Sequence, residues 1–462
     1  MSTVQGAPGG LQKHISNPWR IGVRSCLHAV ALAVSTAARL ASQQPDSTAA
    51  LPGTLYEEVA STTDPSQRFA LFLPTGYDST RAWPVLFAMD PRARALSPLS
   101  RLRAAADRYG YVIASSYRTQ SDSAPDPTEA AFFAMYAETG RRIRIDHRRV
   151  YLVGFSGTAR AGWTFAYRLI GHAAGMLGAG AGLPTRWSLP DPPTGGPAPV
   201  FFGTIGISDF NYEELIGVDS ALDRTTVRHH VAVFDGSHSW PPEPLMREGV
   251  EWFELQAMRS GTRPADPAWI DSIYRVRLDA GRALEAAGDS FPAWQRYRLT
   301  VGDFDGLHET ASAASSASRL QRSKAVQGAL KQQRRNVTLS GEYLGRVRQY
   351  VAKVRASPEP LDLQESLKDL RIRELQHEIE ASTDSLEVQA LRRLLSYAFL
   401  VMASYESSDA LRANNPARAL SLLDVADAIR PGSTAVCEKR KRAMVMLGQD
   451  TTGVACPAPA GR

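Results

Sequence analysis

The chain has 462 residues, of which 44% are hydrophobic and 22% charged, and its formal net charge is +6. These proportions are ordinary for a globular protein and exclude a long disordered chain, a collagen-like sequence and a polytopic membrane protein. The length predicts about three domains, or one large domain with a second one, and a chain of this size folds without a metal or disulfide.

Residues 1–41 have the order of a secretory signal peptide. Three basic residues and no acid precede an apolar run from Cys26 to Val34, and small residues follow it. The run is too short to span a bilayer, which takes about 20 residues. We expect cleavage near Ala37 or Ala41, no membrane span, and export to the periplasm or the medium. An amphipathic helix or an uncleaved anchor is the alternative, and residues 42–53 are expected to form a linker.

Strand-like and helix-like stretches alternate in residues 54–260. Several strand candidates are short apolar runs without polar alternation, which is typical of strands buried on both faces of a parallel sheet. Two strands precede any helix, so we expect an antiparallel start to an α/β layered fold of about eight mostly parallel strands. The predicted strands are Leu55–Ala60, Arg68–Leu73, Pro84–Met89, Tyr111–Ser115, Val150–Gly154, Ala174–Gly178, Val200–Ile205 and His230–Phe234, and the predicted helices are Pro98–Arg108, Pro127–Arg142, Ala159–Ile170 and Leu245–Ser260.

The sequence changes character after residue 260. A Pro-containing linker at 261–270 leads into residues 271–450, which are rich in Ala, Leu, Arg and Glu and predict an all-α region, and 451–462 predict a flexible tail. Two stretches have the spacing of tetratricopeptide (TPR) helices, but no period of about 34 residues links them, so a plain helical domain is an equal alternative. These stretches carry Gly288, Ala293 and Tyr297, and Ala419, Leu423, Ala426 and Pro431.

A basic run lies in the helical region. Ten Lys or Arg residues and one acid, Glu342, occur between Arg319 and Arg355. A solvated helical face balanced by the acidic stretch Glu359–Glu387 explains such a run, and a patch for an anionic partner or membrane surface is the alternative. Aromatic residues are nearly absent from it, so we expect no nucleic-acid partner, and a protein partner on the C-terminal helices stays a candidate.

Three cysteines are present, and cleavage of the leader removes Cys26. In an oxidising compartment Cys437 and Cys456 either close a small C-terminal loop or remain unpaired thiols. The sequence leaves both outcomes open, because pairing depends on whether the Cβ atoms meet.

The clearest chemical motif lies at the end of a predicted strand. An apolar run ends at Gly154, Ser156 follows, and a helical pattern begins at once. This is the context of a nucleophile elbow, a tight strand-to-helix turn that needs small neighbours, and Gly154 and Gly157 meet that need. The usual Gly-x-Ser-x-Gly pattern has glycine where this chain has Thr158.

A serine hydroxyl needs a general base to attack a carbonyl at neutral pH. Asp209 and His238 each follow a later predicted strand, where open α/β sheets build their sites, and the order Ser156, Asp209, His238 is that of nucleophile, acid and base on such sheets. We therefore predict a Ser-His-Asp catalytic triad. The alternative role for Asp209 is a helix N-cap, and Asp219 and Asp223 are rival acids further from the strand end.

These motifs resemble the α/β-hydrolases of the esterase, feruloyl-esterase and polyhydroxybutyrate-depolymerase type, over roughly residues 54–259. The resemblance implies that backbone N–H groups of Gly157 and of the Met89–Asp90 region form an oxyanion hole. It also implies acyl transfer from a small or polymeric carboxylic ester to water. The segments that carry it are Gly154-Phe-Ser-Gly157, Gly206-Ile-Ser-Asp209, Asp235-Gly-Ser-His-Ser-Trp-Pro241 and Trp83-Pro-Val-Leu-Phe-Ala-Met-Asp-Pro91, in which Asp90-Pro91 replaces a His-Gly type turn.

Two alternatives to a secreted esterase stay open. A serine peptidase of the same fold would use the same triad, although no motif for gripping a peptide amine is found. A catalytically silent hydrolase fold, with the helical region as its binding surface, is favoured by Thr158 and the partial repeats and opposed by the intact triad order. No residue cluster has metal-ligand spacing and no Gly-rich loop precedes a helix, so we predict no cofactor and no metal.

The segment Leu183–Pro199 bears on substrate access. It contains six prolines, which remove backbone donors and block a helix. We therefore expect an irregular flap instead of a helical cap, and an open site in the α/β part. The C-terminal helices either shade one rim of that site or pack far from Ser156.

Overall fold

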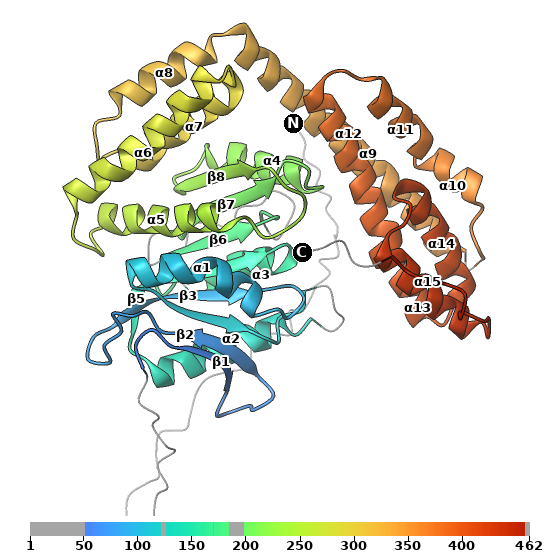
Figure 1. Cartoon of the computed structure of the whole chain (residues 1–462), viewed down its shortest axis with the longest axis horizontal. Coiled ribbons are helices and arrows are strands. Elements are labelled where there is room, and N and C mark those ends of the chain that lie inside the picture. The colour runs from blue at the N-terminus through green and yellow to red at the C-terminus, as the bar shows by residue number, and fades with distance from the viewer. Residues whose placement is uncertain (1–50, 122–125, 170, 184–197, 358, 458–462) are drawn as a thin grey trace, which may run out of the picture. The chain divides into compact units, whose positions relative to one another are not determined.

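A computed structural model describes residues 51–121, 126–169, 171–183, 198–357 and 359–457 (Figure 1). The predicted signal peptide and most of the predicted linker, the flap residues 184–197 and the last five residues lie outside this described part. Among the described residues, no helix has the length and apolarity needed to cross a membrane.

One eight-stranded sheet forms the N-terminal half of the fold, with strand order β1-β2-β4-β3-β5-β6-β7-β8. The pairs β1–β2 and β2–β4 are antiparallel, and every later pair is parallel. This is the sheet of an α/β-hydrolase, so the predicted fold class and the antiparallel start are confirmed. The strands are β1 (Leu55–Ala60), β2 (Arg68–Phe72), β3 (Trp83–Met89), β4 (Val112–Ser116), β5 (Ile145–Phe155), β6 (Gly175–Ala179), β7 (Val200–Gly206) and β8 (His229–Phe234).

Helices cover both faces of the sheet (Figure 1). Alternate residues of β3 show this, since Val85 and Phe87 belong to one hydrophobic cluster and Leu86 and Ala88 to another. The first cluster contains side chains of α2 (Thr128–Arg142), α3 (Gly157–Arg168) and α4 (Tyr212–Leu222), and the second those of α1 (Leu96–Tyr109) and α5 (Glu243–Arg259).

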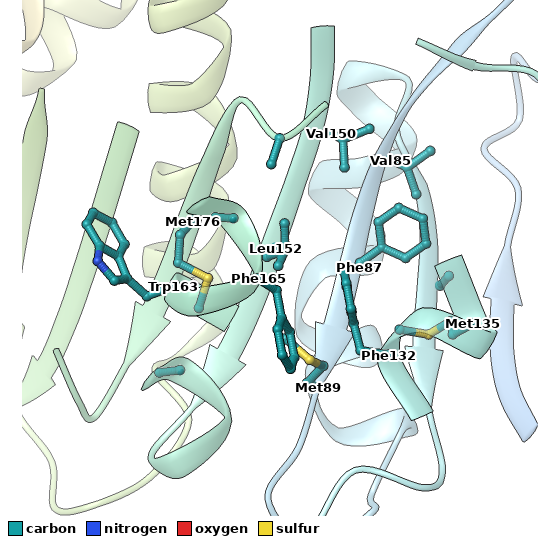
Figure 2. Packing of buried hydrophobic residues seen from close by; sticks show 14 of the residues in the cluster. Val85, Phe87, Met89, Phe132, Met135, Val150, Leu152, Trp163, Phe165 and Met176 are labelled. Carbon is teal, nitrogen blue, oxygen red and sulfur yellow. The ribbon is translucent and has the colours of Figure 1, made fainter. Parts of the chain in front are cut away.

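Figure 2 shows part of the first cluster, where Phe132 of α2 and Phe165 of α3 lie beside Phe87 and Leu152 of the sheet. The rings of Phe132 and Phe165 are stacked with centroids 4.8 Å apart. Each fully buried aromatic side chain contributes about 1.5–3 kcal/mol of hydrophobic stabilisation. This packing fixes α3, and with it the turn that carries Ser156.

Helix α4 was not predicted from the sequence. Gly217 interrupts its pattern, and a glycine inside a helix is unfavourable by about 1 kcal/mol relative to alanine. Tertiary packing compensates, because Leu215, Val218 and Leu222 recur at helical spacing and are buried in the first cluster.

The described residues after 260 contain helices and no strand, as predicted. The helices are α6 (Pro267–Ala286), α7 (Ser290–Phe304), α8 (Ala311–Gln321), α9 (Lys324–Ala356), α10 (Leu363–Asp369), α11 (Ile372–Ala381), α12 (Ser385–Leu400), the π-helical η1 (Val401–Glu406), α13 (Ser407–Arg412), α14 (Pro416–Ile429) and α15 (Thr434–Met446). The TPR relationship of α7 and α14 stays a prediction. Cys437 of α15 is disulfide-bonded to Cys456, so the segment predicted as a flexible tail is tied to α15 at this point.

The basic run lies largely on α9, and acidic side chains balance part of it. Lys353 pairs with Glu365 and Asp369, both within the acidic stretch named above. Arg355 pairs with Glu406 from outside that stretch. The interpretation as a charge-balanced helical face is therefore supported at the C-terminal end of α9.

The predicted linker at 261–270 does not separate two hydrophobic cores. Leu255 and Met258 of α5 share one cluster with Ile270, Tyr274 and Tyr297 of α6 and α7. Polar contacts cross the same boundary. Arg277 of α6 pairs with Glu248 and Glu251 of α5, and Asp303 of α7 lies 3.0 Å from Nδ1 of the fully buried His230. Helices α6 and α7 therefore pack on α5 and form one compact unit with the sheet.

A fragment ending after Ser260 is expected to fail to fold, because Glu248 loses Arg277 and Arg296 and the buried His230 loses Asp303. Removing one partner of a buried charge pair typically costs about 3–5 kcal/mol. A fragment ending after Ser323 keeps α6–α8 and should unfold cooperatively. Circular dichroism melts of both fragments test this, and a cooperative melt of the shorter fragment at the temperature of the longer one would contradict it.

Candidate active site

Ser156 stands at the turn between β5 and α3. Its backbone has φ 53° and ψ −124°, outside the conformations that non-glycine residues favour. Its N–H donates to Ala179 O at 2.8 Å and its own carbonyl accepts from Ala159 N–H at 3.0 Å, which holds the turn in place. Strain of this kind costs about 1–3 kcal/mol and clusters at functional sites.

The turn has no room for a larger residue at Gly154. A Cβ atom there would lie 2.4 Å from Thr158 O and 2.7 Å from Ala159 N, both backbone atoms of α3. Glycine at this position therefore lets the helix approach the end of β5 closely enough to form the elbow.

Thr158 fits where the usual motif has glycine. Its side chain is fully buried, and its Oγ1 lies 2.8 Å from the carbonyl oxygens of Met89 and Phe155. The same oxygen accepts the Phe155 N–H at 3.1 Å. The hydroxyl thus joins the ends of β3 and β5 to the first turn of α3, so the departure from glycine strengthens the elbow.

We expect Thr158→Val, which keeps the side-chain shape but removes the hydroxyl, to destabilise the protein by about 1–3 kcal/mol because buried backbone groups lose a partner. Thermal unfolding measures this. Thr164→Val on the same helix is the matched control, since Thr164 is exposed and its hydroxyl donates to Arg160 O at 3.3 Å, within its own helix. Equal stability of the two variants would contradict the role given to Thr158.

Ser156, His238 and Asp209 come together as the sequence order predicts. His238 Nε2 lies 2.9 Å from Ser156 Oγ, and Nδ1 lies 2.9 and 2.8 Å from the two carboxylate oxygens of Asp209. Asp209 is fully buried, and the His238 side chain is 20% exposed. This arrangement allows the imidazole to take a proton from the hydroxyl while the carboxylate fixes its orientation.

Two glycines, Gly206 and Gly180, allow the backbone to pack closely around the triad. At Gly206 a Cβ atom would lie 2.5 Å from the carbonyl oxygens of Gly236 and Ser237, so the loops after β7 and β8 nearly touch. At Gly180, with φ 65°, a Cβ atom would lie 2.7 Å from the Phe155 ring and 3.2 Å from His238 Cε1. Both glycines keep space for the imidazole and its acid.

Two aromatic rings pack against the imidazole. The ring centroids of Phe155 and Phe210 lie 4.6 and 4.2 Å from that of His238. Phe155 precedes Ser156 and Phe210 follows Asp209, so the neighbours of the nucleophile and the acid also orient the base.

The structure places Asp209 differently from a helix N-cap and from the two rival acids. Asn211 is the N-cap of α4, and its N–H donates to Asp209 Oδ1 at 2.8 Å. Asp219 and Asp223 instead each lie 3.3 Å from His229 Nε2 at the start of β8, whereas His238 follows the end of that strand. Although burial opposes it, these two carboxylates raise the pKa of His229 to about 9.

The loop after β3 leaves one backbone donor available. Pro91 has no N–H, the Arg92 N–H donates to Asp90 Oδ1 at 2.8 Å, and the Ala93 N–H donates to Thr119 O at 2.9 Å. The Asp90 N–H has no acceptor among the described residues. Met89 lies inside the ladder, in register with Gly154 and Ser116 on either side.

Gly157 offers a second donor. It is the first residue of α3, and the first N–H groups of a helix have no intrahelical acceptor. The geometry therefore favours Gly157 and Asp90 as the oxyanion donors over Met89, and the assignment stays a prediction.

Sequence reasoning missed the role of the Asp90 side chain. The buried carboxylate accepts from the Arg94 guanidinium at 3.0 and 2.9 Å and from Trp240 Nε1–H at 2.8 Å. It thereby ties the loop after β3 to the loop that carries His238. The Asp90 to Arg94 spacing was the signal available, whereas the Trp240 contact spans 150 positions.

No group of three or more His, Cys, Asp or Glu side chains suited to a metal ion occurs in the described part of the chain.

No family model and no curated protein matches this chain. Several solved structures match part of it. A fluorophosphonate-binding serine hydrolase of Staphylococcus aureus is 14% identical with a TM-score of 0.36, and the match covers 44% of this chain and 98% of that one. The feruloyl esterase module of Clostridium thermocellum is 10% identical with a TM-score of 0.32, covering 43% and 86%. Dipeptidyl peptidase 4 of Porphyromonas gingivalis is 14% identical with a TM-score of 0.32, covering 43% and 34%.

Proposed function

We propose that this protein is an exported serine hydrolase that cleaves carboxylic esters through an acyl-enzyme. The observation that carries the proposal is the position of His238, within hydrogen-bond distance of Ser156 on one side and of the buried Asp209 on the other. The strained backbone of Ser156, whose side chain is half-buried, supports it, because such strain at a strand-to-helix turn is typical of a nucleophile.

In the proposed reaction His238 Nε2 takes the proton of Ser156 as Oγ attacks the ester carbonyl. The imidazolium then protonates the leaving alcohol, and the acyl group stays on Oγ. Water attacks the acyl-enzyme in the same way, with His238 again accepting and returning the proton. Asp209 stabilises the charged imidazole in both halves.

The oxyanion that forms in each half needs fixed donors. The N–H groups of Gly157 and Asp90 are the candidates, one from α3 and one from the loop after β3. Losing one such donor typically costs a factor on the order of 10²–10³ in rate. Hydrogen bonds to the Asp90 carboxylate hold its loop in one conformation, which keeps the donor in place.

Export is part of the proposal. The order of charged, apolar and small residues in the first 41 positions predicts it, and the bond between Cys437 and Cys456 supports it because disulfides persist in oxidising compartments. The acyl and alcohol groups of the substrate are left to experiment.

A fluorophosphonate probe tests the proposal, followed by ester and amide substrates that share one acyl group. We expect labelling at Ser156 and turnover of the ester. Turnover of the amide at a comparable rate would identify a peptidase instead. Absence of both labelling and turnover would identify a silent hydrolase fold that acts by binding.

A further inference from the structure

One face of α12 contacts the loop that carries Asp209. Arg393 donates through Nη1 to Ile207 O at 2.7 Å, and through Nε and Nη2 to Glu213 Oε1 at 3.0 and 2.6 Å. Its guanidinium also lies over the Tyr212 ring, 4.4 Å from the centroid. The loop is therefore held on both sides of Asp209, two residues before it and four residues after it.

Tyr397 extends the contact by one helical turn. Residues four apart lie on the same face of a helix, so Arg393 and Tyr397 point to the same side of α12. The Tyr397 ring lies 6.5 Å from that of Phe210, and Phe210 in turn packs on His238 at 4.2 Å. The acid and the base thus both have neighbours that contact α12.

The ion pair is buried, which makes it sensitive to the loss of one partner. The side chains of Arg393 and Glu213 are 4% and 8% exposed. Burial raises the pKa of Glu213, and the charge of Arg393 opposes that rise. Without Arg393 the buried Glu213 carboxylate would lose its ion-pair partner, and an uncompensated buried charge is strongly destabilising where it stands.

We propose that Arg393 is a positioning residue for the triad, through which the C-terminal helical region holds the Asp209 loop in its working geometry. This role rests on the proposed function. The helical region then takes part in catalysis from outside the sheet, through contacts to the loop that carries the acid.

The test compares three variants of the full chain. Arg393→Met removes the donors but keeps much of the apolar stem, and Arg393→Lys keeps one charge without the planar two-pronged geometry. Arg298→Met is the matched control, because Arg298 pairs with Asp219 of α4 at 2.7 Å and so also joins a later helix to α4, away from the acid loop. The readouts are kcat and KM for an ester, the rate of fluorophosphonate labelling, and amide hydrogen exchange of residues 207–214.

We expect Arg393→Met to lower kcat and the labelling rate on the order of 10- to 100-fold, as a small misplacement of a catalytic group does. KM should stay within about twofold, exchange of 207–214 should be faster, Arg393→Lys should be intermediate, and Arg298→Met should behave as the parent. In an Asp209→Asn background, Arg393→Met should lower kcat little further. The effects of two substitutions are not additive when one residue acts through the other.

Unchanged kcat and exchange in Arg393→Met, an equal loss in Arg298→Met, or a full additive loss in the Asp209→Asn background would each overturn the positioning role. If the parent protein is not labelled and hydrolyses no ester, the proposed function fails. Exchange of 207–214 then still reports whether Arg393 holds the loop.

Discussion

Replacing Ser156 by alanine is expected to lower ester hydrolysis by a factor on the order of 10⁴ or more and to leave the fold intact. The hydroxyl is the proposed nucleophile, and its Oγ lies within hydrogen-bond distance of His238 Nε2. Removing it should therefore not disturb the core. Steady-state kinetics measures the loss, and a thermal melt checks the fold.

Ser239→Ala is the matched control for this experiment. Ser239 is exposed in the loop that carries His238, and its hydroxyl contacts Ser237 O at 3.4 Å. It should keep full activity and stability. Turnover retained in Ser156→Ala, after contaminating hydrolases are removed, would refute the nucleophile assignment.

Asp209→Asn is expected to lower kcat by a factor on the order of 10⁴, the loss typical of this change in a Ser-His-Asp triad. An amide in place of the carboxylate presents a donor to His238 Nδ1 and favours the wrong imidazole tautomer. Because Asn has nearly the same shape, the loop should keep its hydrogen bond from Asn211 N–H.

Asp219→Asn tests one of the two rival acids and should affect stability instead of activity. His229 has a folded pKa of about 9, above its ordinary 6.5, because Asp219 and Asp223 favour the charged ring although burial opposes it. A raised pKa stabilises the fold fully below pH 6.5, and this stabilisation is lost as the pH rises through 9. We therefore expect Asp219→Asn to lower the melting temperature at pH 6 more than at pH 9.5. A large loss of kcat in Asp219→Asn, with Asp209→Asn active, would show that the acid is wrongly assigned.

The sheet and the triad could be predicted because their signals are local. Several strands of the sheet are short apolar runs, and Ser156, Asp209 and His238 each follow the end of a strand within four residues. Parallel strands place such positions at one edge of the sheet, so order along the chain was sufficient to bring them together.

The supporting contacts could not be predicted, because they join distant positions without a motif. Arg393 and Glu213 are 180 positions apart, and Trp240 and Asp90 are 150 apart. The contacts on the face of α5 that points away from the sheet could not be predicted for a similar reason. Its acids Glu248 and Glu251 resemble solvated residues in the sequence, but both are buried and both pair with Arg277 of a later helix.

At Thr158 the motif alone predicts a weaker turn than the one in the structure. Judged by the usual pattern it weakens the elbow and favours a silent fold. Its hydroxyl instead lies 2.8 Å from Met89 O, a partner 69 positions away, so Thr158 fits the turn and the silent fold stays an alternative for experiment.

The buried pair of His230 and Asp303 has a consequence for the order of folding during synthesis. His230 lies in β8, the last strand of the sheet, and Trp252 of α5 also donates to the Asp303 carboxylate, at 2.7 Å. A growing chain therefore contains His230 73 residues before it contains the carboxylate that both side chains need. We expect the last strand and α5 to dock stably only after α7 has been made, so that the C-terminal helices set the moment at which the sheet becomes native.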